Sequence, residues 1–214
     1  MRKLIVGMSL FLMMFTFIGC DEASEEEVLS TPNIGKVTRL SAHSIKVSWS
    51  TVDNADGYRV HYGWEDDIDE SLSLGNVVYN NNNVTINGLE PYTTYYFWVQ
   101  AFNSTSSSSF SSSKSCRTGI ETPSVSVSQK TSTSVTLWFP LVDGATNYGI
   151  HVGTTSDSSQ SSFLQTYYPG NSLLNIGELD LSGYKRGNTY YWFVTAYGEG
   201  ANQSETGMCS LTLK

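Results

Sequence analysis

Three histidines, His43, His61 and His151, are the side chains of this 214-residue chain best suited to acid–base or metal chemistry near neutral pH. They complete no familiar catalytic pattern: the sequence has no Ser–His–Asp order, zincin motif, glycine-rich phosphate loop or Cys-x-x-Cys. The sequence therefore predicts a protein that is not an enzyme and holds no cofactor. The alternative is a catalytic site assembled from distant loops.

Two polar segments could offer ligands of other kinds. The acidic stretch Glu65–Glu70 carries oxygens that suit a hard cation such as calcium. It lacks the glycine and the closing glutamate of an EF-hand loop, so it is interpreted as a solvated acidic loop, and no metal site is predicted. The serine-rich segment Asn103–Ser115 is interpreted as a flexible polar loop leading into a strand.

An internal repeat organises the chain, with offsets of 90 residues early and 95 residues late. Within each matching segment apolar and polar residues alternate with period two, as in a strand with one buried face. Abundant aromatic residues and turn-forming Ser, Asn and Gly also favour an all-β fold. The matching segments are Ser44–Trp49 with Ser134–Phe139, Tyr58–Gly63 with Tyr148–Gly153, and Thr94–Phe102 with Thr189–Tyr197.

Each copy resembles a fibronectin type III domain. Ser44–Trp49 resembles that family's strand B with its core tryptophan at Trp49, and Gly57–Tyr62 resembles strand C. Leu89–Tyr95 resembles the corner that leads into strand F, with Tyr95 as the corner tyrosine. The resemblance implies two tandem immunoglobulin-like β-sandwiches, and a Tyr95 hydroxyl that bonds to backbone a few residues upstream.

The second copy departs from the first at two places. Phe139 takes the core position of Trp49 while Trp138 falls on the outer phase, and a different sequence precedes the corner tyrosine Tyr190. The short linker predicts a rod with limited bending. The predicted divisions are a signal peptide at 1–19, an acidic tether at 20–31, a first domain at 32–118, a linker at 119–123 and a second domain at 124–214.

Aromatic residues on the outer phase of the predicted F strands are the candidate ligand-binding surface. If Tyr95 and every second residue after it face inward, the residues between them face outward. In this fold they lie beside a histidine of the neighbouring strand. Flat rings with polar neighbours can stack on sugars or anchor a protein. The alternative is cross-strand packing that stiffens the sheet. The candidate residues are Tyr96, Trp98 and His61 in the first copy and Tyr191, Phe193 and His151 in the second.

The N-terminus predicts the compartment. A basic start, a short apolar run and the sequence Phe17-Ile18-Gly19-Cys20 resemble the signal and lipobox of bacterial lipoproteins, although leucine is usual at the position of Phe17. The resemblance implies cleavage before Cys20, lipid such as palmitate on that cysteine, and attachment to a membrane. An ordinary secretory signal is the alternative. Acidic residues directly after Cys20 resemble the surface-export signal of lipoproteins in Bacteroidota-like bacteria.

The net charge and the cysteines bear on the kind of partner and on the state of the thiols. Removal of Arg2 and Lys3 leaves ten basic against 20 acidic residues, which argues against a nucleic-acid partner. Cys116 and Cys209 are expected to be unpaired, partly buried thiols. The predicted function is a non-catalytic lipoprotein of the bacterial cell envelope, at the outer membrane or cell surface, that acts as a spacer and binds a protein or glycan. A carbohydrate-binding lipoprotein of a glycan uptake system and an adhesin are the alternatives.

Overall fold

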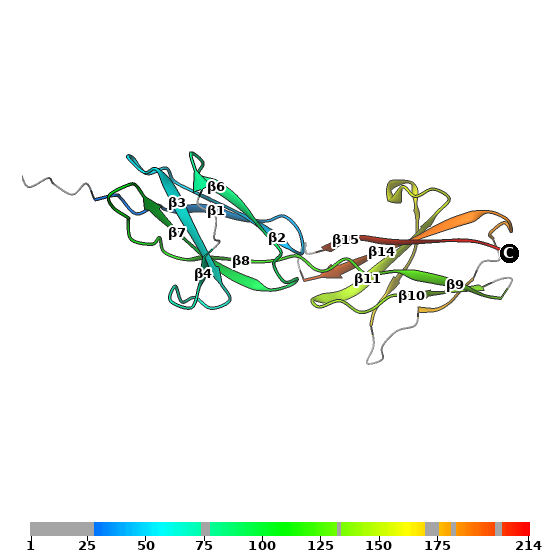
Figure 1. Cartoon of the computed structure of the whole chain (residues 1–214). Helices are drawn as coiled ribbons and strands as arrows, with labels where there is room; N and C mark the ends of the chain where they lie inside the picture. The colour runs from blue at the N-terminus through cyan, green and yellow to red at the C-terminus, as the bar shows by residue number, and fades with distance from the viewer. Residues whose placement is uncertain (1–27, 74–77, 132–133, 170–175, 181–182, 200–202) are drawn as a thin grey trace, which may run out of the picture.

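The computed structural model describes residues 28–73, 78–131, 134–169, 176–180, 183–199 and 203–214. Two β bodies lie end to end, the first near the N-terminus and the second carrying the C-terminus (Figure 1). No helix within the described residues is long and apolar enough to cross a membrane. The predicted signal peptide, Cys20 and the tether up to residue 27 lie outside the described residues.

The first body consists of two antiparallel sheets. One has the order β1-β2-β6, and the other has the order β4-β3-β7-β8 with β5 also paired to β3. Its strands are β1 (Ile34–Arg39), β2 (Ser44–Trp49), β3 (Gly57–Gly63), β4 (Leu72–Ser73), β5 (Val78–Tyr79), β6 (Asn83–Asn87), β7 (Thr94–Phe102) and β8 (Lys114–Arg117).

The second body repeats this arrangement, with sheets ordered β13-β10-β9 and β12-β11-β14-β15. A single turn of 3-10 helix, η1 (Ser158–Gln160), follows β11. The strands are β9 (Ser126–Thr131), β10 (Ser134–Trp138), β11 (Ala145–Gly153), β12 (Ser162–Tyr167), β13 (Ile176–Asp180), β14 (Thr189–Gly198) and β15 (Gln203–Thr212). The predicted all-β fold of two tandem sandwiches is confirmed.

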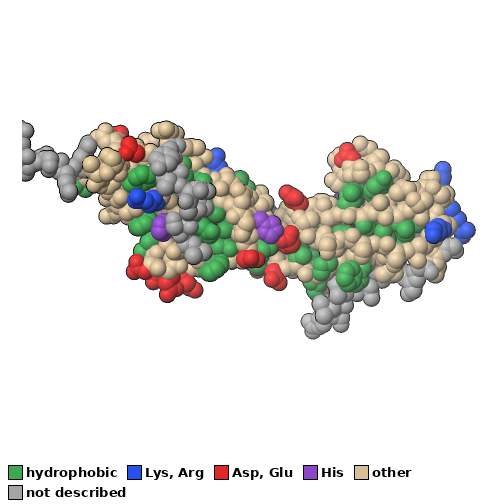
Figure 2. All heavy atoms as spheres, in the orientation of Figure 1, with side chains coloured by type: hydrophobic (Ala, Val, Ile, Leu, Met, Phe, Trp, Pro, Cys, Tyr) green, Lys and Arg blue, Asp and Glu red, His purple; other side chains and the backbone are tan. Residues whose placement is uncertain are grey.

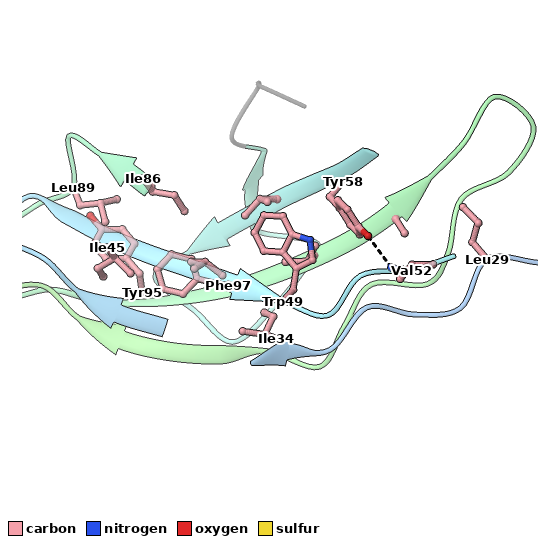
Figure 3. Close-up of a cluster of buried hydrophobic side chains, with 14 residues drawn as sticks. Leu29, Ile34, Ile45, Trp49, Val52, Tyr58, Ile86, Leu89, Tyr95 and Phe97 are labelled. Carbon is pink, nitrogen blue, oxygen red and sulfur yellow. Dashed lines mark hydrogen bonds between the residues drawn. The ribbon is translucent and has the colours of Figure 1, made fainter. Parts of the chain in front are cut away.

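Alternating side chains from both sheets form the core of the first body, as the period-two pattern predicts. Figure 3 shows Trp49, Tyr58 and Phe97 between the two sheets. Trp49 and Tyr58 pack with ring centroids 5.4 Å apart, and the Tyr58 hydroxyl accepts a 2.8 Å bond from the Val52 amide. The equivalent bond in the second body joins Val142 to Tyr148, also at 2.8 Å.

The tyrosine corners form in both bodies as expected from the resemblance. The Glu90 amide donates to the Tyr95 hydroxyl at 3.0 Å, and the Lys185 amide donates to the Tyr190 hydroxyl at 2.9 Å. Each bond satisfies a backbone donor where the chain turns between sheets. The substituted corner sequence of the second copy therefore preserves the contact that fixes the turn.

The altered tryptophan positions of the second copy also follow the predicted phases. Phe139 is buried in the core, whereas Trp138 is 45% exposed. Trp192, at the position of Phe97 in the first body, is fully buried. The larger indole thus lies on β14 in the second core and on β2 in the first.

Candidate functional site

The predicted surface aromatics lie on the expected sheet faces but are not all exposed. Trp98 and Phe193 alternate with the core residues of β7 and β14, and neither belongs to the main core of its body. Trp98 is nevertheless only 5% exposed and Phe193 only 2% exposed. The expectation of solvent-exposed rings is therefore wrong for these two residues, while Tyr96 and Tyr191 are half-buried.

The serine-rich segment explains the burial of Trp98. It runs along β7, with the Ser108 amide donating to the Ala101 carbonyl and the Ser111 amide to the Val99 carbonyl. Phe110 is carried onto the outer face of the sheet, where its ring meets His61 edge-on at 4.8 Å. The expectation of a flexible polar loop is wrong for Ser108 to Ser111, because hydrogen bonds hold these residues against the strand, whereas the expected strand forms from Lys114 as β8. Trp98 also stacks on Tyr96 at 6.5 Å.

A hydrogen bond with the loop after β3 fixes the His61 ring. Its Nδ1 lies 3.0 Å from the Ser71 hydroxyl, which itself donates to the Ile68 carbonyl at 2.6 Å. Because the hydroxyl proton is used in that bond, we infer that Nδ1 of His61 donates to Ser71. Burial, with a contribution from the charge of Arg59, lowers the pKa of His61. A neutral, hydrogen-bonded His61 therefore has a structural role in this face.

The second body repeats this loop. The Ser161 hydroxyl donates to the Ser158 carbonyl at 2.6 Å, as Ser71 does to Ile68. Asp157 accepts the amide of the residue two positions later, as Asp67 does. The shared pattern is His-x-Gly-x-x-x-Asp-x-x-x-Ser at 61–71 and 151–161. This pattern was not among the predicted features, although it continues the strand match at the same offset of 90 residues.

A hollow of about 210 Å³ lies on the outer face of the four-stranded sheet of the second body, lined by residues of β11, β14 and β15 and by the loop after β11. Phe193 and Tyr197 contribute aromatic surface, and His151 contributes an imidazole. The remaining side chains carry hydroxyl or amide groups, and no lining side chain is an acid, a lysine or an arginine. The other lining residues are Ser158, Ser161, Thr195, Gln203, Ser204 and Thr206. Two predicted residues, His151 and Phe193, thus meet in one concave site, whereas Tyr191 does not line it.

A second hollow, of about 380 Å³, lies at the junction of the two bodies. His43 and Glu121 both line it, and His43 Nε2 is 2.7 Å from Glu121 Oε2. The Leu89 carbonyl bonds the other ring nitrogen at 2.8 Å. This bond, followed by the nearby charge of Glu121, raises the pKa of His43. His43 therefore belongs to the interdomain contact.

Metal and thiol chemistry find no support in the described part of the chain. No group of three His, Cys, Asp or Glu side chains in this part is arranged to hold a metal ion. Cys116 and Cys209 are free and half-buried as predicted. Burial raises the pKa of Cys116 and raises that of Cys209 to about 12, so both thiols stay protonated near neutral pH.

Comparison with known proteins relates the first body to a known domain family. Residues 30–116 match the family model of the fibronectin type III domain. The chain is similar to the FN1–FN3 domains of chicken CNTN1, with 18% identity over 86% of this chain and 67% of that one and a TM-score of 0.40. It is also similar to a two-domain fibronectin type III segment from chicken tenascin, with 17% identity over 85% of this chain and 98% of that one and a TM-score of 0.44.

The first body is therefore a fibronectin type III domain. The second body has the same strand order and the same corner tyrosine. It also has the equivalent hydrogen bond from the Val142 amide to the Tyr148 hydroxyl. The described chain is thus a tandem pair of sandwiches with matching strand order, here called domain 1 (β1 to β8) and domain 2 (β9 to β15).

Proposed function

We propose that the protein is a non-catalytic spacer and binding module, anchored to the bacterial envelope by lipid on Cys20 and binding a protein or glycan. Fibronectin type III domains are typically modules of this kind, and the junction between the domains is the observation that carries the proposal. A spacer must hold its far end at a fixed distance and orientation from its anchor. This requires contacts between the domains across the linker rather than a flexible linker alone.

Tyr92 of domain 1 reaches across the junction. Its backbone has a positive φ of 48° and its amide donates to the Gly119 carbonyl at 2.8 Å. Its ring packs against the core of domain 2, so close to Gly144 that a Cβ there would lie 2.3 Å from the ring. The guanidinium of Arg117 lies 4.8 Å from the same ring. One side chain of domain 1 is thus part of the packing of domain 2.

The linker residues also belong to both domains. The Gly119 amide donates to the Ser41 carbonyl at 2.9 Å, and the buried Thr118 hydroxyl donates to the Glu90 carbonyl at 2.7 Å. The next residue, Ile120, is 1% exposed within the core of domain 2. Ordered backbone on one side and a buried side chain on the other leave little free chain between the domains. This supports a stiff connection.

The direction of the rod suits presentation away from a membrane. Leu29 is buried in domain 1, so at most the residues from 21 to 28 separate a lipid-bearing Cys20 from the folded body. Fully extended, such a segment reaches about 28 Å. The described chain enters domain 1 at the end away from domain 2 (Figure 1). In this proposal domain 1 stays near the membrane and domain 2 lies farther out.

Lipid labelling tests the anchor. In cells that process bacterial lipoproteins, a palmitate analogue should label the wild-type chain, and membrane fractionation should recover it with the membrane. Cys20→Ala should lose both properties. The matched control Cys116→Ala should keep both, because Cys116 is a half-buried strand residue. Equal labelling and equal membrane recovery of Cys20→Ala and the wild type would refute the anchor.

A protein ligand is a second candidate, supported by exposed apolar side chains on domain 2. Phe163 is 61% exposed and Met208 is 48% exposed, and they flank the sheet face that contains His151 and Phe193. Apolar residues of this kind can anchor a partner protein. An adhesin-type function predicts a specific protein partner and no response to glycans.

A further inference from the structure

We propose that the hollow on the outer sheet face of domain 2 binds one neutral sugar unit of a glycan. This inference deepens the binding function proposed above and rests on it. It assigns that function to one domain and to one chemical class of ligand. The two domains differ at equivalent positions of the same sheet face, and these differences support the inference.

Five positions around this face differ systematically between the domains. In domain 1 they carry long or aromatic side chains, and in domain 2 they carry smaller or more polar ones. Their equivalence follows from the repeated registers and from Ser108 and Ser204, whose hydroxyls accept the Ala101 and Ala196 amides at 3.0 Å. The pairs are Arg59 with Gly149, Ile68 with Ser158, Trp98 with Phe193, Gln100 with Thr195, and Phe110 with Thr206.

In domain 1 these side chains cover the face. The guanidinium of Arg59 lies 4.4 Å from the centre of the Phe102 ring, and it donates to Gln100 and to the Ser107 hydroxyl. The Phe110 ring meets His61 edge-on, and Trp98 on the same face is only 5% exposed. The domain therefore fills with its own side chains the region where domain 2 has its hollow.

In domain 2 the same face is open. Gly149 replaces the arginine and lets the ring of Tyr197 lie across the strand, where a Cβ at Gly149 would be 2.9 Å from Tyr197 Cε2. Thr206 replaces Phe110, and its hydroxyl pairs with that of Thr195 at 2.8 Å. The hollow of about 210 Å³ is thus a consequence of specific residue differences on a shared framework.

The chemistry of the lining selects an uncharged, hydroxyl-rich ligand. The Ser161 hydroxyl donates to Ser158, so it offers its lone pairs as acceptors. The paired hydroxyls of Thr195 and Thr206 use one proton between them and leave the other for a ligand. The Gln203 amide is exposed and can both donate and accept. The lining offers no carboxylate, lysine or arginine to a charged ligand, and His151 is its only titratable group near neutral pH.

The size and the aromatic surface favour a single sugar ring. A hollow of about 210 Å³ is smaller than the pockets of roughly 300–1,000 Å³ that hold drug-sized molecules. Tyr197 is half-buried and presents part of its ring beside the polar groups. A pyranose has the matching pattern of an apolar face and a hydroxyl-bearing rim.

An aromatic side chain of a protein partner would fit this hollow less well. Phe110 takes the corresponding position in domain 1, where its ring meets His61 edge-on. In domain 2 an inserted apolar ring would cover the paired hydroxyls of Thr195 and Thr206 and would offer no acceptor for the proton that this pair leaves free. Burial of a polar group without a hydrogen-bond partner is unfavourable.

Saturation-transfer NMR on the full chain in detergent micelles tests the inference. The probes are the methyl glycosides of glucose, galactose, mannose and N-acetylglucosamine, with glucuronate and N-acetylneuraminate as charged comparators. We expect at least one neutral glycoside to bind with millimolar affinity and the charged sugars to bind at least about tenfold more weakly. Thr206→Phe, which introduces the domain 1 residue, should abolish binding.

Thr212→Phe is the matched control. It lies on the same strand, is exposed, and loses an equivalent hydroxyl pair with Thr189 at 2.8 Å, but it does not line the hollow. It should bind as the wild type does. Gln203→Ala provides a second test that leaves the fold undisturbed, because that side chain is exposed; it should weaken binding by about tenfold.

Three results would overturn the inference. They are no binding of any neutral glycoside, equal loss of binding in Thr206→Phe and Thr212→Phe, or equal binding of neutral and charged sugars. A protein partner whose binding is lost in Thr206→Phe, without any sugar response, would assign the hollow to a protein instead. Lipid labelling and the rigidity of the junction are measured separately, so failure here leaves the anchored spacer intact.

Discussion

The imidazole of His43 lies 2.7 Å from the carboxylate of Glu121, and this ion pair joins the turn between β1 and β2 to the interdomain linker. Both side chains are partly exposed, at 51% and 41%, so solvent screens the pair and its contribution to stability is small. Its position matters more than its strength. It holds the linker at the waist of the molecule, where Figure 2 shows histidine and acidic side chains together.

The first prediction concerns the pH dependence of this junction. The pKa of His43 is raised above its ordinary value, first by the Leu89 carbonyl and then by Glu121, with Glu90 adding a smaller effect. Because the pKa of His43 is higher in the folded state, protonated His43 stabilises the folded junction. This stabilisation is complete below the unfolded pKa of about 6.5 and is lost as the pH rises through the folded pKa. ¹⁵N relaxation should show more independent tumbling of the two domains above that range.

Glu121→Gln is the control for this pH dependence. It removes the charge that faces His43 and keeps the size of the side chain. The variant should show weaker pH dependence of interdomain motion than the wild type. Identical motion across the titration of His43 in the wild-type protein would contradict the prediction.

The second prediction concerns the close approach of Tyr92 to Gly144. Gly144→Ala places a Cβ 2.3 Å from the Tyr92 ring at a residue with a φ of +79°. Gly88→Ala is the matched control, because its φ is +74° and nothing lies within 4 Å of the added carbon. Each variant carries the backbone cost of about 1–2 kcal/mol for the left-handed conformation. Only Gly144→Ala should also separate the domains, measured as a larger radius of gyration by small-angle X-ray scattering.

The third prediction concerns the tyrosine corner. Tyr95→Phe leaves the Glu90 amide without its 3.0 Å acceptor and should lower the free energy of unfolding of domain 1 by about 1 kcal/mol. Tyr96→Phe changes the next residue on the opposite face, where the side chain is half-buried. It should change the free energy of unfolding by less than about 0.5 kcal/mol. Urea denaturation compares the two, and equal losses would contradict the role of the corner.

The fourth prediction concerns the cover over Trp98. Phe110→Ala should expose the indole, shift tryptophan emission to longer wavelength, and destabilise domain 1 by about 1–3 kcal/mol, because an apolar contact over the sheet is lost. Phe163→Ala is the control. That ring also meets a histidine edge-on, at 5.4 Å, but it is 61% exposed. Its removal should leave both the emission and the stability nearly unchanged; equal effects would argue against the covering role of Phe110.

The fifth prediction concerns the thiols. Burial raises the pKa of Cys209 to about 12 and also raises that of Cys116. Iodoacetamide near pH 8 should therefore alkylate both cysteines slowly in the native protein and rapidly in urea, because the thiolate is the reactive form. Mass spectrometry of the modified peptides measures the rates. Rapid native alkylation of Cys209 would show that its strand is more open than the structure describes.

Much of the fold could be predicted because its signals are local. The alternation around Ile45 and Trp49 marks a half-buried strand, and the repeated spacing to Tyr95 and Tyr190 marks the corner. These patterns need only the residues of one strand and its turn. The strand order and the core then follow from the way two such faces must pack.

The site was predicted less well because its form depends on contacts between segments. The phase of Trp98 was visible in the sequence, but its cover comes from a serine-rich segment without periodicity that is held by Ser108 and Ser111 along β7. The hollow arises from differences between repeats, such as Gly149 opposite Arg59, whereas repeat matching emphasises identities. A pairwise comparison of the outward-facing residues of the two repeats would have revealed these differences in the sequence.

Residual dipolar couplings of the two domains in one weakly aligned sample test the central claim, a stiff tandem rod, most directly. In a stiff rod, β3 and β7 of domain 1 and β11 and β14 of domain 2 should fit a single alignment tensor with the orientation of Figure 1. Two tensors of clearly different magnitude would show that the domains move independently, and would contradict the spacer.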